Sequence, residues 1–457
     1  MSISQSQKFN ETLSNLEDLG IYQLRELARE IGVHLPTTMR KGDLIQKIRE
    51  IASGEAQPFV ATTKKGRPPK QFQTTQTEHT GSEREYDYKD WGKSILPYTE
   101  VPLTLYRMSD NASFIFDERK YDTVFDVSGI VSIDDAGNAR LHEGDLDEIG
   151  DKRIARIEFP VITKFGIRDG DKIEGRMGKS LKDGGLCLFD VKTINGKPLP
   201  LTRLNFADTK AMPVQYPVVL ENMPITKFIT PIGNGQRVLV QSKDQYVPKH
   251  FMHALADEFA RKQEVLYITL DEQPEDYYSS EQQNLKFILC PFDLPVDKQL
   301  YILELALNRA KRLAEQGENI VVMIEDLITV ARLYNRCYKS SGLGEGDEFV
   351  IDSIKKLLAC GRNVCDGGTV TLVCGVSGAH DATLPQDFLY ETKKACNCFI
   401  TLNTGAYFGV YDFDISASYT VNQDRMLSDA LLQKAGAVRQ ECEGKTALEI
   451  TAILNEN

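Results

Sequence analysis

Apolar positions recur in two rhythms along the 457 residues, and the first of them is helical. In residues 15–53 they are spaced three and four apart in two short runs, which predicts a compact helical module. Arg40 and Lys41 lie between these runs. Two short helices joined by a basic turn suit a docking module for nucleic acid. They equally suit a helical cap whose turn is merely solvated.

Residues 54–95 lack this pattern and are rich in Thr and Gln, so they cannot bury a core and are expected to be a disordered linker. The linker contains the run KKGRPPK, in which the basic residues are Lys64, Lys65, Arg67 and Lys70. Prolines hold such a segment extended, and arginine is attracted to the negative potential of a narrow groove. The run therefore resembles an AT-hook, although short basic runs in linkers are often only solvated charge.

Short strand-like runs follow in residues 120–197, separated by Gly, Asp and Asn turns. They read DTVFDVSGIVSI, ARIEFPVITKFGI, DKIEGRMG and GLCLFDVKTI. About five strands in so short a segment predict a small barrel of the oligonucleotide-binding (OB) kind. Spacing alone does not separate a nucleic-acid-binding barrel from a structural one.

In residues 198–457 apolar strands alternate with amphipathic helices, which predicts a parallel sheet covered on both faces. Ligands of such sheets bind outside the carboxyl ends of the strands. Acid pairs stand there: Asp271 and Glu272 follow VLYITL, and Glu325 and Asp326 follow IVVMI. They indicate a present or former active site, although a strand-end acid is also an ordinary turn former.

Composition narrows the function classes. Hydrophobic residues make up 41% and charged residues 26%, as in a soluble globular protein, and no apolar stretch is long enough to span a membrane. The first residues do not resemble a secretory leader, so we expect a cytoplasmic protein. The net charge of −12 argues against a binder held by bulk positive charge, but leaves room for a local basic groove. Nine cysteines without a CxxC pair and six histidines offer no metal-ligand pattern.

Several short motifs in the last domain occur in an order and spacing that resemble one family. They are PIGNGQR (231–237), DEQPE (271–275), AKRL (310–313), ARLYN (331–335) and GRN (361–363). Together with the helical module and the barrel, they make the chain similar to the transcription termination factor Rho family. The resemblance implies a RecA-like, P-loop-type domain in a ring of six subunits. It also implies RNA as a partner and translocation driven by ATP with Mg²⁺.

The resemblance assigns roles to five positions of the nucleotide site. Glu272 stands where the family places the acid that activates the attacking water, and Glu325 where it places the acid that organises magnesium. A phosphate-binding loop needs glycine, lysine and a hydroxyl residue. Val247, Pro248 and Lys249 stand there instead. Proline has no N–H for phosphate and a β-branched residue disfavours positive φ, so ATP and Mg²⁺ are implied by the family but opposed by this loop.

Other family positions are changed as well. Ile415 occupies the arginine-finger position and cannot stabilise phosphate charge. The pore loop reads SGLGEGDE in residues 341–348, and a second central loop has DAT at 381–383, without the basic residues that grip RNA. The barrel has GNAR where the family has stacking rings, which leaves Asn138 and Arg140 as candidate nucleic-acid contacts.

Three functions remain open. The chain is expected to be a Rho-like protein that binds RNA or another nucleic acid, acts in transcription termination or its regulation, and has lost or impaired ATPase. Its partners would include RNA polymerase or an authentic Rho, in a homo- or hetero-hexameric ring. The second function is an active ATP-dependent RNA translocase with Lys243 or Lys249 as the phosphate-binding cation. The third is a DNA-binding scaffold that uses the AT-hook-like run.

Overall fold

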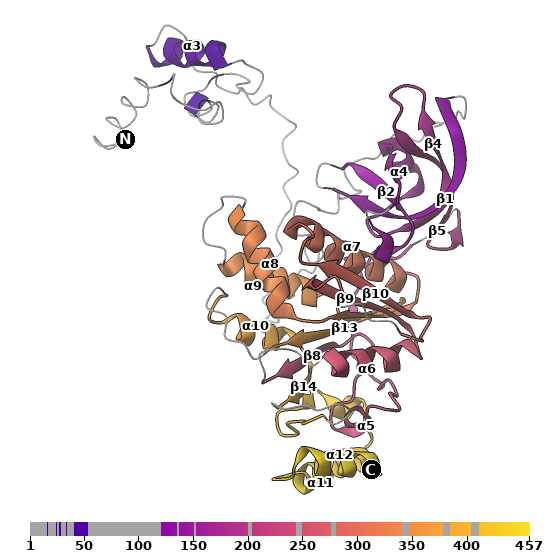
Figure 1. Cartoon of the computed structure of the whole chain (residues 1–457), viewed down its shortest axis with the longest axis vertical. Helices are drawn as coiled ribbons and strands as arrows, with labels where there is room; N and C mark the ends of the chain where they lie inside the picture. The colour runs from indigo at the N-terminus through magenta and orange to yellow at the C-terminus, as the bar shows by residue number, and fades with distance from the viewer. Residues whose placement is uncertain are drawn as a thin grey trace, which may run out of the picture. The chain divides into compact units, whose positions relative to one another are not determined.

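The structure is a computed structural model of the whole chain (Figure 1). It describes residues 41–53, 120–134, 137–149, 152–199, 203–243, 249–275, 280–340, 347–377, 384–403 and 411–457, with positions 16, 24, 27, 28 and 33. The described residues fall into two units, one within 1–84 and one within 85–457. Each unit is described by itself below.

The N-terminal unit has a small helical core. Its helix α3 spans Lys41–Ala52 and buries Leu44 and Ile48. Leu24 and Ala28 are fully buried in the same cluster. The apolar positions spaced three and four apart are therefore the ones that lie inside, as the helical pattern predicts.

The second unit begins with a β-barrel. Its strands are β1 (Tyr121–Ile133), β2 (Ala139–Glu143), β3 (Ile154–Ile157), β4 (Lys172–Ser180), β5 (Leu186–Ile194) and the short β6 (Lys197–Pro198). They pair in the order β3-β2-β1-β4-β5-β6, and an additional parallel pairing of β3 with β5 closes the barrel. Five strands closed in this way form the predicted OB-type barrel.

One part of the barrel differs from the sequence prediction. ARIEFPVITKFGI was expected to be one strand, but only β3 is extended, and Phe159–Phe165 form helix α4. Pro160 stands in the first turn of α4, where a missing N–H is harmless. Gly166 ends the helix with φ 60°, a left-handed conformation that favours glycine. The strand prediction was wrong because a short apolar run does not distinguish a strand from a buried helix.

The rest of the unit is built on a mixed sheet in the order β10-β9-β11-β13-β8-β14-β15. Its strands are β8 (Arg237–Ser242), β9 (Glu264–Glu272), β10 (Leu285–Pro291), β11 (Asn319–Ile324), β13 (Thr369–Val376), β14 (Cys398–Leu402) and β15 (Tyr419–Thr420). Neighbours from β10 to β14 are parallel and β15 is antiparallel. The short strand β12 (Arg362–Val364) pairs antiparallel with β13, and β7 (Ala211–Met212) pairs antiparallel with β12. The predicted parallel α/β class is confirmed.

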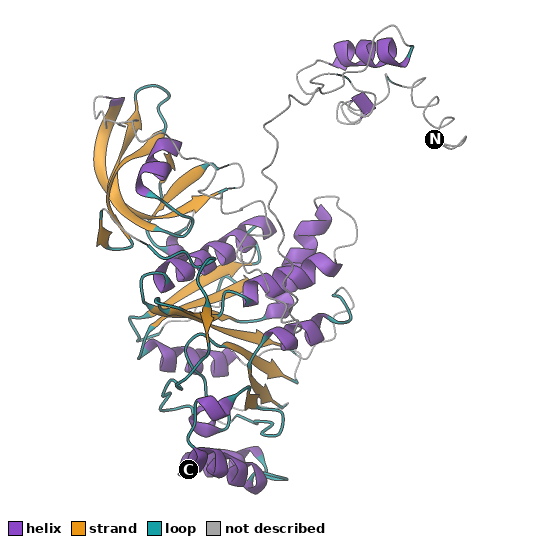
Figure 2. Ribbon diagram, turned by 180° about the vertical axis from the view of Figure 1, so that it is seen from behind, coloured by secondary structure: helices purple, strands orange, loops and turns teal. Residues whose placement is uncertain are grey.

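Helices cover both faces of this sheet, as Figure 2 shows by the strands lying between layers of helix. One core contains α7 (Val296–Ala314), α8 (Leu327–Ser340), α9 (Asp347–Leu358) and α10 (Phe388–Ala395). The other contains α5 (Ile225–Phe228), α6 (Lys249–Ala260), α11 (Asp429–Glu441) and α12 (Ala447–Glu456). In β9, Leu266 and Ile268 belong to the first core, and Val265 and Tyr267 to the second. Side chains alternate between the faces of a strand, so a strand buried on both sides reads as one apolar run.

Candidate functional site

Two strand ends and the start of a helix bring together a lysine and two glutamates, named here the carboxylate–lysine site (Lys249, Glu272 and Glu325). Lys249 opens helix α6, Glu272 ends β9, and Glu325 directly follows β11. Lys249 Nζ lies 2.7 Å from Glu272 Oε2 and 3.5 Å from Glu325 Oε1. One ammonium thus joins the two acids that the sequence singled out separately.

The site is electrostatically uneven because its members differ in burial. The side chain of Glu325 is 7% exposed and that of Lys249 is 39% exposed. Burial raises the pKa of Glu325 to about 7, Lys249 opposes the rise, and the negative charge of Glu272 adds to it. Tyr267, on β9, donates its hydroxyl to Glu325 Oε2 at 3.2 Å. Glu325 therefore carries its charge only with the support of its neighbours.

The second acid of each strand-end pair has a structural position. Asp326 accepts hydrogen bonds from the Ile328 N–H (3.0 Å) and the Ser377 hydroxyl (3.2 Å), and burial raises its pKa. Asp271 adopts φ 57° at the end of β9, and its N–H donates to Gln299 Oε1 at 2.8 Å. Each pair therefore supplies one acid to the site and one to the turn.

Lys243, the other cation near the phosphate-loop position, also forms an ion pair with an acid. It directly follows β8, and its Nζ lies 2.7 Å from Asp414 Oδ2 and 2.6 Å from Asn403 Oδ1. The sequence gives no sign of this pairing, because the three residues are far apart along the chain.

The remaining nucleotide-site positions divide between the core and the undescribed segments. Ile415, at the arginine-finger position, is 6% exposed and packs in the core of α6 and α11, while its carbonyl accepts a hydrogen bond from Arg439. Val247, Pro248 and the loop 381–383 lie outside the described residues. So does most of the acidic pore loop, although its last two acids form the first turn of α9.

In the barrel, the two candidate contacts have different surroundings. Asn138 is exposed, and its backbone and side-chain amides donate to the Asp134 carboxylate at 2.8 and 2.9 Å. Arg140 is exposed on β2 and lies opposite Ser132 on β1 and Arg156 on β3. Asn138 thus closes a turn, whereas Arg140 presents its charge on the barrel surface beside a second arginine that the sequence analysis missed.

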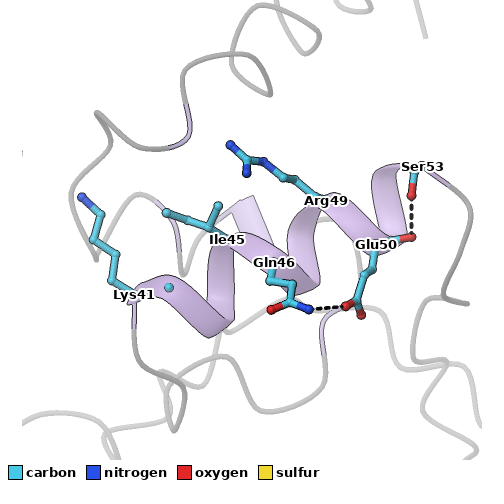
Figure 3. A pocket seen from close by; sticks show the side chains of 7 residues that line it. Lys41, Ile45, Gln46, Arg49, Glu50 and Ser53 are labelled. Carbon is cyan, nitrogen blue, oxygen red and sulfur yellow. Dashed lines mark hydrogen bonds between the residues drawn. The ribbon is translucent and has the colours of Figure 1, made fainter.

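In the N-terminal unit, a hollow of about 880 Å³ lies against one face of α3 (Figure 3). Lys41, Ile45 and Arg49 line it and stand four residues apart, so they share a helix face. This spacing was the signal that would have added Arg49 to the candidate contacts. The other predicted nucleic-acid contacts of this region, Arg40 and the linker residues Lys64, Lys65, Arg67 and Lys70, lie outside the described residues.

Two kinds of feature are absent from the described part of the chain. It has no group of three or more His, Cys, Asp or Glu side chains that could hold a metal ion. It likewise has no helix that is both long and apolar enough to cross a membrane.

Known proteins resemble this chain over different lengths. Residues 15–53 match the family described as "Rho termination factor, N-terminal domain". The chain is 24% identical to the protein named "Transcription termination factor Rho" from Thermotoga maritima, with 97% of this chain and 93% of that protein covered. It is 31% identical to the protein of the same name from Streptobacillus moniliformis, over 53% of this chain and 62% of that protein. The solved structure of an ATP synthase subunit, NeqB, aligns with 54% of this chain and 66% of its own chain. Its sequence identity of 13% and TM-score of 0.46 are too low to bear on function.

Proposed function

This chain belongs to the family of transcription termination factor Rho, and from that premise we propose a nucleic-acid-binding protein of transcription termination or its regulation whose ATPase is lost or impaired. One observation carries the second half of the proposal. Lys249 lies between Glu272 and Glu325, the two positions at which the family holds its catalytic and magnesium-organising acids. An ammonium group therefore occupies the part of the site where a divalent cation would be expected.

The physical argument concerns charge. Mg²⁺ reaches a nucleotide site through carboxylates, a hydroxyl residue and phosphate oxygens. Lys249 replaces the hydroxyl residue and is already ion-paired with both acids, so a metal would first have to displace it. Breaking a partly buried ion pair leaves charges uncompensated, which is strongly unfavourable. Without the metal, the acids would repel a triphosphate. The residues present do not fit a magnesium nucleotide.

The active translocase has less support. It requires Lys243 or Lys249 as the cation that grips phosphate. Lys243 is paired with Asp414, and Lys249 is paired with both glutamates. A phosphate ligand would have to compete with carboxylates for either lysine. For the DNA-binding scaffold, no described residue bears on the choice, because the AT-hook-like run lies outside them.

Titration calorimetry with Mg-ATP tests the lost ATPase. We expect the unmodified protein to give no binding heat and no RNA-stimulated hydrolysis. The triple variant Val247→Gly, Pro248→Lys, Lys249→Thr restores glycine, lysine and hydroxyl, and is expected to bind Mg-ATP. Lys298→Thr, an exposed lysine of α7 in no ion pair among the described residues, is the matched control and should behave as the parent does. RNA-stimulated hydrolysis by the unmodified protein, abolished in Glu272→Gln, would instead establish the translocase.

The family's ring extends the proposal to partners. We infer that this subunit binds RNA through Arg140 and its surroundings on the barrel, and joins a hexameric ring, alone or with an authentic Rho. A subunit without an arginine finger and with an occupied site would impair two interfaces of a mixed ring. Mixing the purified chain with an active Rho should lower RNA-stimulated ATP hydrolysis more than dilution does, and the two should co-purify. No co-purification and unchanged termination in vitro would refute the mixed ring.

A further inference from the structure

A second pocket lies at the opposite edge of the sheet from the carboxylate–lysine site, where β8 begins. Its cavity volume is about 290 Å³. The polar side chains that line it are those of Gln236, Arg237, Arg362, Asn363, Asn397, Asn422 and Arg425. Three lining residues are arginines, and no Asp or Glu is among the described residues that line the cavity, named here the arginine pocket.

Arg237 is held in place without a counter-charge. Its Nε donates to the Ala395 carbonyl at 2.5 Å and its Nη1 to the Gly361 carbonyl at 2.7 Å. Among the described residues no carboxylate pairs with it, and burial lowers its pKa. A guanidinium stays charged in proteins, so this partly buried cation lacks an anion.

The other two arginines differ in burial. Arg362, on β12, is 8% exposed, and its guanidinium lies 4.3 Å from the centre of the Phe206 ring. Arg425 is exposed, and no hydrogen bond or ion pair of its side chain occurs within the described part of the chain. The pocket therefore combines two fixed cations in its wall with one accessible cation at its edge.

Backbone geometry holds the wall in this shape. Gly235 has φ 87°, and a Cβ built on it would lie 2.5 Å from the Asn363 nitrogen, so only glycine allows this approach to β12. The Gly235 N–H donates to Thr371 Oγ1 at 2.9 Å. Asn397 accepts a hydrogen bond from the Arg237 N–H through Oδ1 at 2.8 Å, which leaves its Nδ2 group as a donor at the pocket. Arg237 and Arg362 are thus preorganised on the strands β8 and β12.

We propose that the arginine pocket binds a dianionic phosphate group, either free or as a terminal monoester. Three arginines and no acid among the described lining residues favour a ligand with more than one negative charge, and a phosphate monoester carries about −1.5 to −2 at neutral pH. Guanidinium forks match phosphate oxygens in pairs, and amide groups supply further donors. The cavity lies near the lower end of the roughly 300–1,000 Å³ range of ligand pockets, so it fits a small group. The group is either free phosphate or the terminal phosphate of a nucleic-acid strand.

This proposal is independent of the proposed ATPase loss, since the two sites share no residue. Calorimetry of the full chain with inorganic phosphate, at constant ionic strength and with acetate as the singly charged comparison, tests it. We expect phosphate to bind and acetate not to. Arg425→Gln should weaken phosphate binding about tenfold or more, because it removes a charge-assisted contact without disturbing a described hydrogen bond. Arg336→Gln, an exposed arginine of α8, is the matched control and should bind as the parent does.

A second pair of probes distinguishes free phosphate from the terminal phosphate of a strand. A 5′-phosphorylated dinucleotide is compared with the same dinucleotide ending in a 5′-hydroxyl. Tighter binding of the phosphorylated form than of inorganic phosphate, lost in Arg425→Gln, assigns the pocket to a strand end. Binding of inorganic phosphate alone assigns it to the free ion. Absence of phosphate binding in the parent, or equal weakening in Arg425→Gln and Arg336→Gln, overturns the proposal.

Discussion

At the scale of single residues, Glu325 links the carboxylate–lysine site to the stability of the protein. Its pKa of about 7 in the folded chain lies above its ordinary value of 4.5, because burial disfavours the charged form. A group whose pKa is raised by folding stabilises fully below its unfolded pKa, and this stabilisation is lost as pH rises through the folded pKa. The window for Glu325 is therefore about pH 4.5 to 7.

Glu325→Gln should remove this pH dependence, since glutamine keeps an acceptor for Tyr267 but does not titrate. The free energy of unfolding of the parent, measured in urea at pH 5 and pH 8, should fall more with rising pH than that of the variant. The excess fall should be roughly 3 kcal/mol, because each pH unit between pH 5 and the folded pKa of Glu325 contributes about 1.4 kcal/mol. Glu281→Gln, an exposed acid, should keep the parent's pH dependence. Parallel profiles for the parent and Glu325→Gln would show that Glu325 does not titrate in this window.

At the scale of elements, the sequence predicts long buried strands better than short apolar runs. The central parts of β9 and β11 are almost entirely apolar because both faces are buried, so their type was readable. The run that became β3 and α4 was not, because helix and strand are equally compatible with a short apolar run. Helix α12 was overlooked although Thr446 and Glu449 form a capping box before its buried Ile450, a signal present in the sequence.

The elements also explain why the site was only partly predictable. The sequence placed Glu272 and Glu325 at strand ends, and the sheet order makes β9 and β11 neighbours, so their approach follows from the topology. The position of Lys249 Nζ does not follow, because a flexible side chain at the start of α6 has many rotamers. The arginine pocket was not anticipated either. Arg237 and Arg362 belong to motifs that the sequence analysis used only to identify the family, and their approach depends on Gly235.

At the scale of the second unit, a buried ionic cluster ties the barrel to the α/β domain. Glu315, at the end of α7, is fully buried and lies 3.0 Å from Arg168 of the barrel and 3.2 Å from Arg312 of α7. Arg203, between the two domains, lies 3.6 Å away, and the Phe206 N–H donates to Glu315 Oε1 at 2.9 Å. One carboxylate thus holds three guanidiniums and a backbone amide of the connecting segment. This cluster is therefore one of the polar links between the two domains.

Glu315→Gln should therefore destabilise the unit far more than a surface change does. It removes the charge that pairs with Arg168 and Arg312, while Arg203 keeps its bidentate pair with Asp171, and breaking a buried ionic cluster costs about 3–5 kcal/mol. Denaturant unfolding should report this loss, and limited proteolysis should cut the segment between the barrel and β8 faster in the variant. Glu318→Gln, an exposed acid three residues along the chain, makes the same charge change outside the cluster and should stay within about 0.5 kcal/mol of the parent. Equal stability and equal cleavage of the two variants would show that the Glu315 cluster does not hold the two domains together.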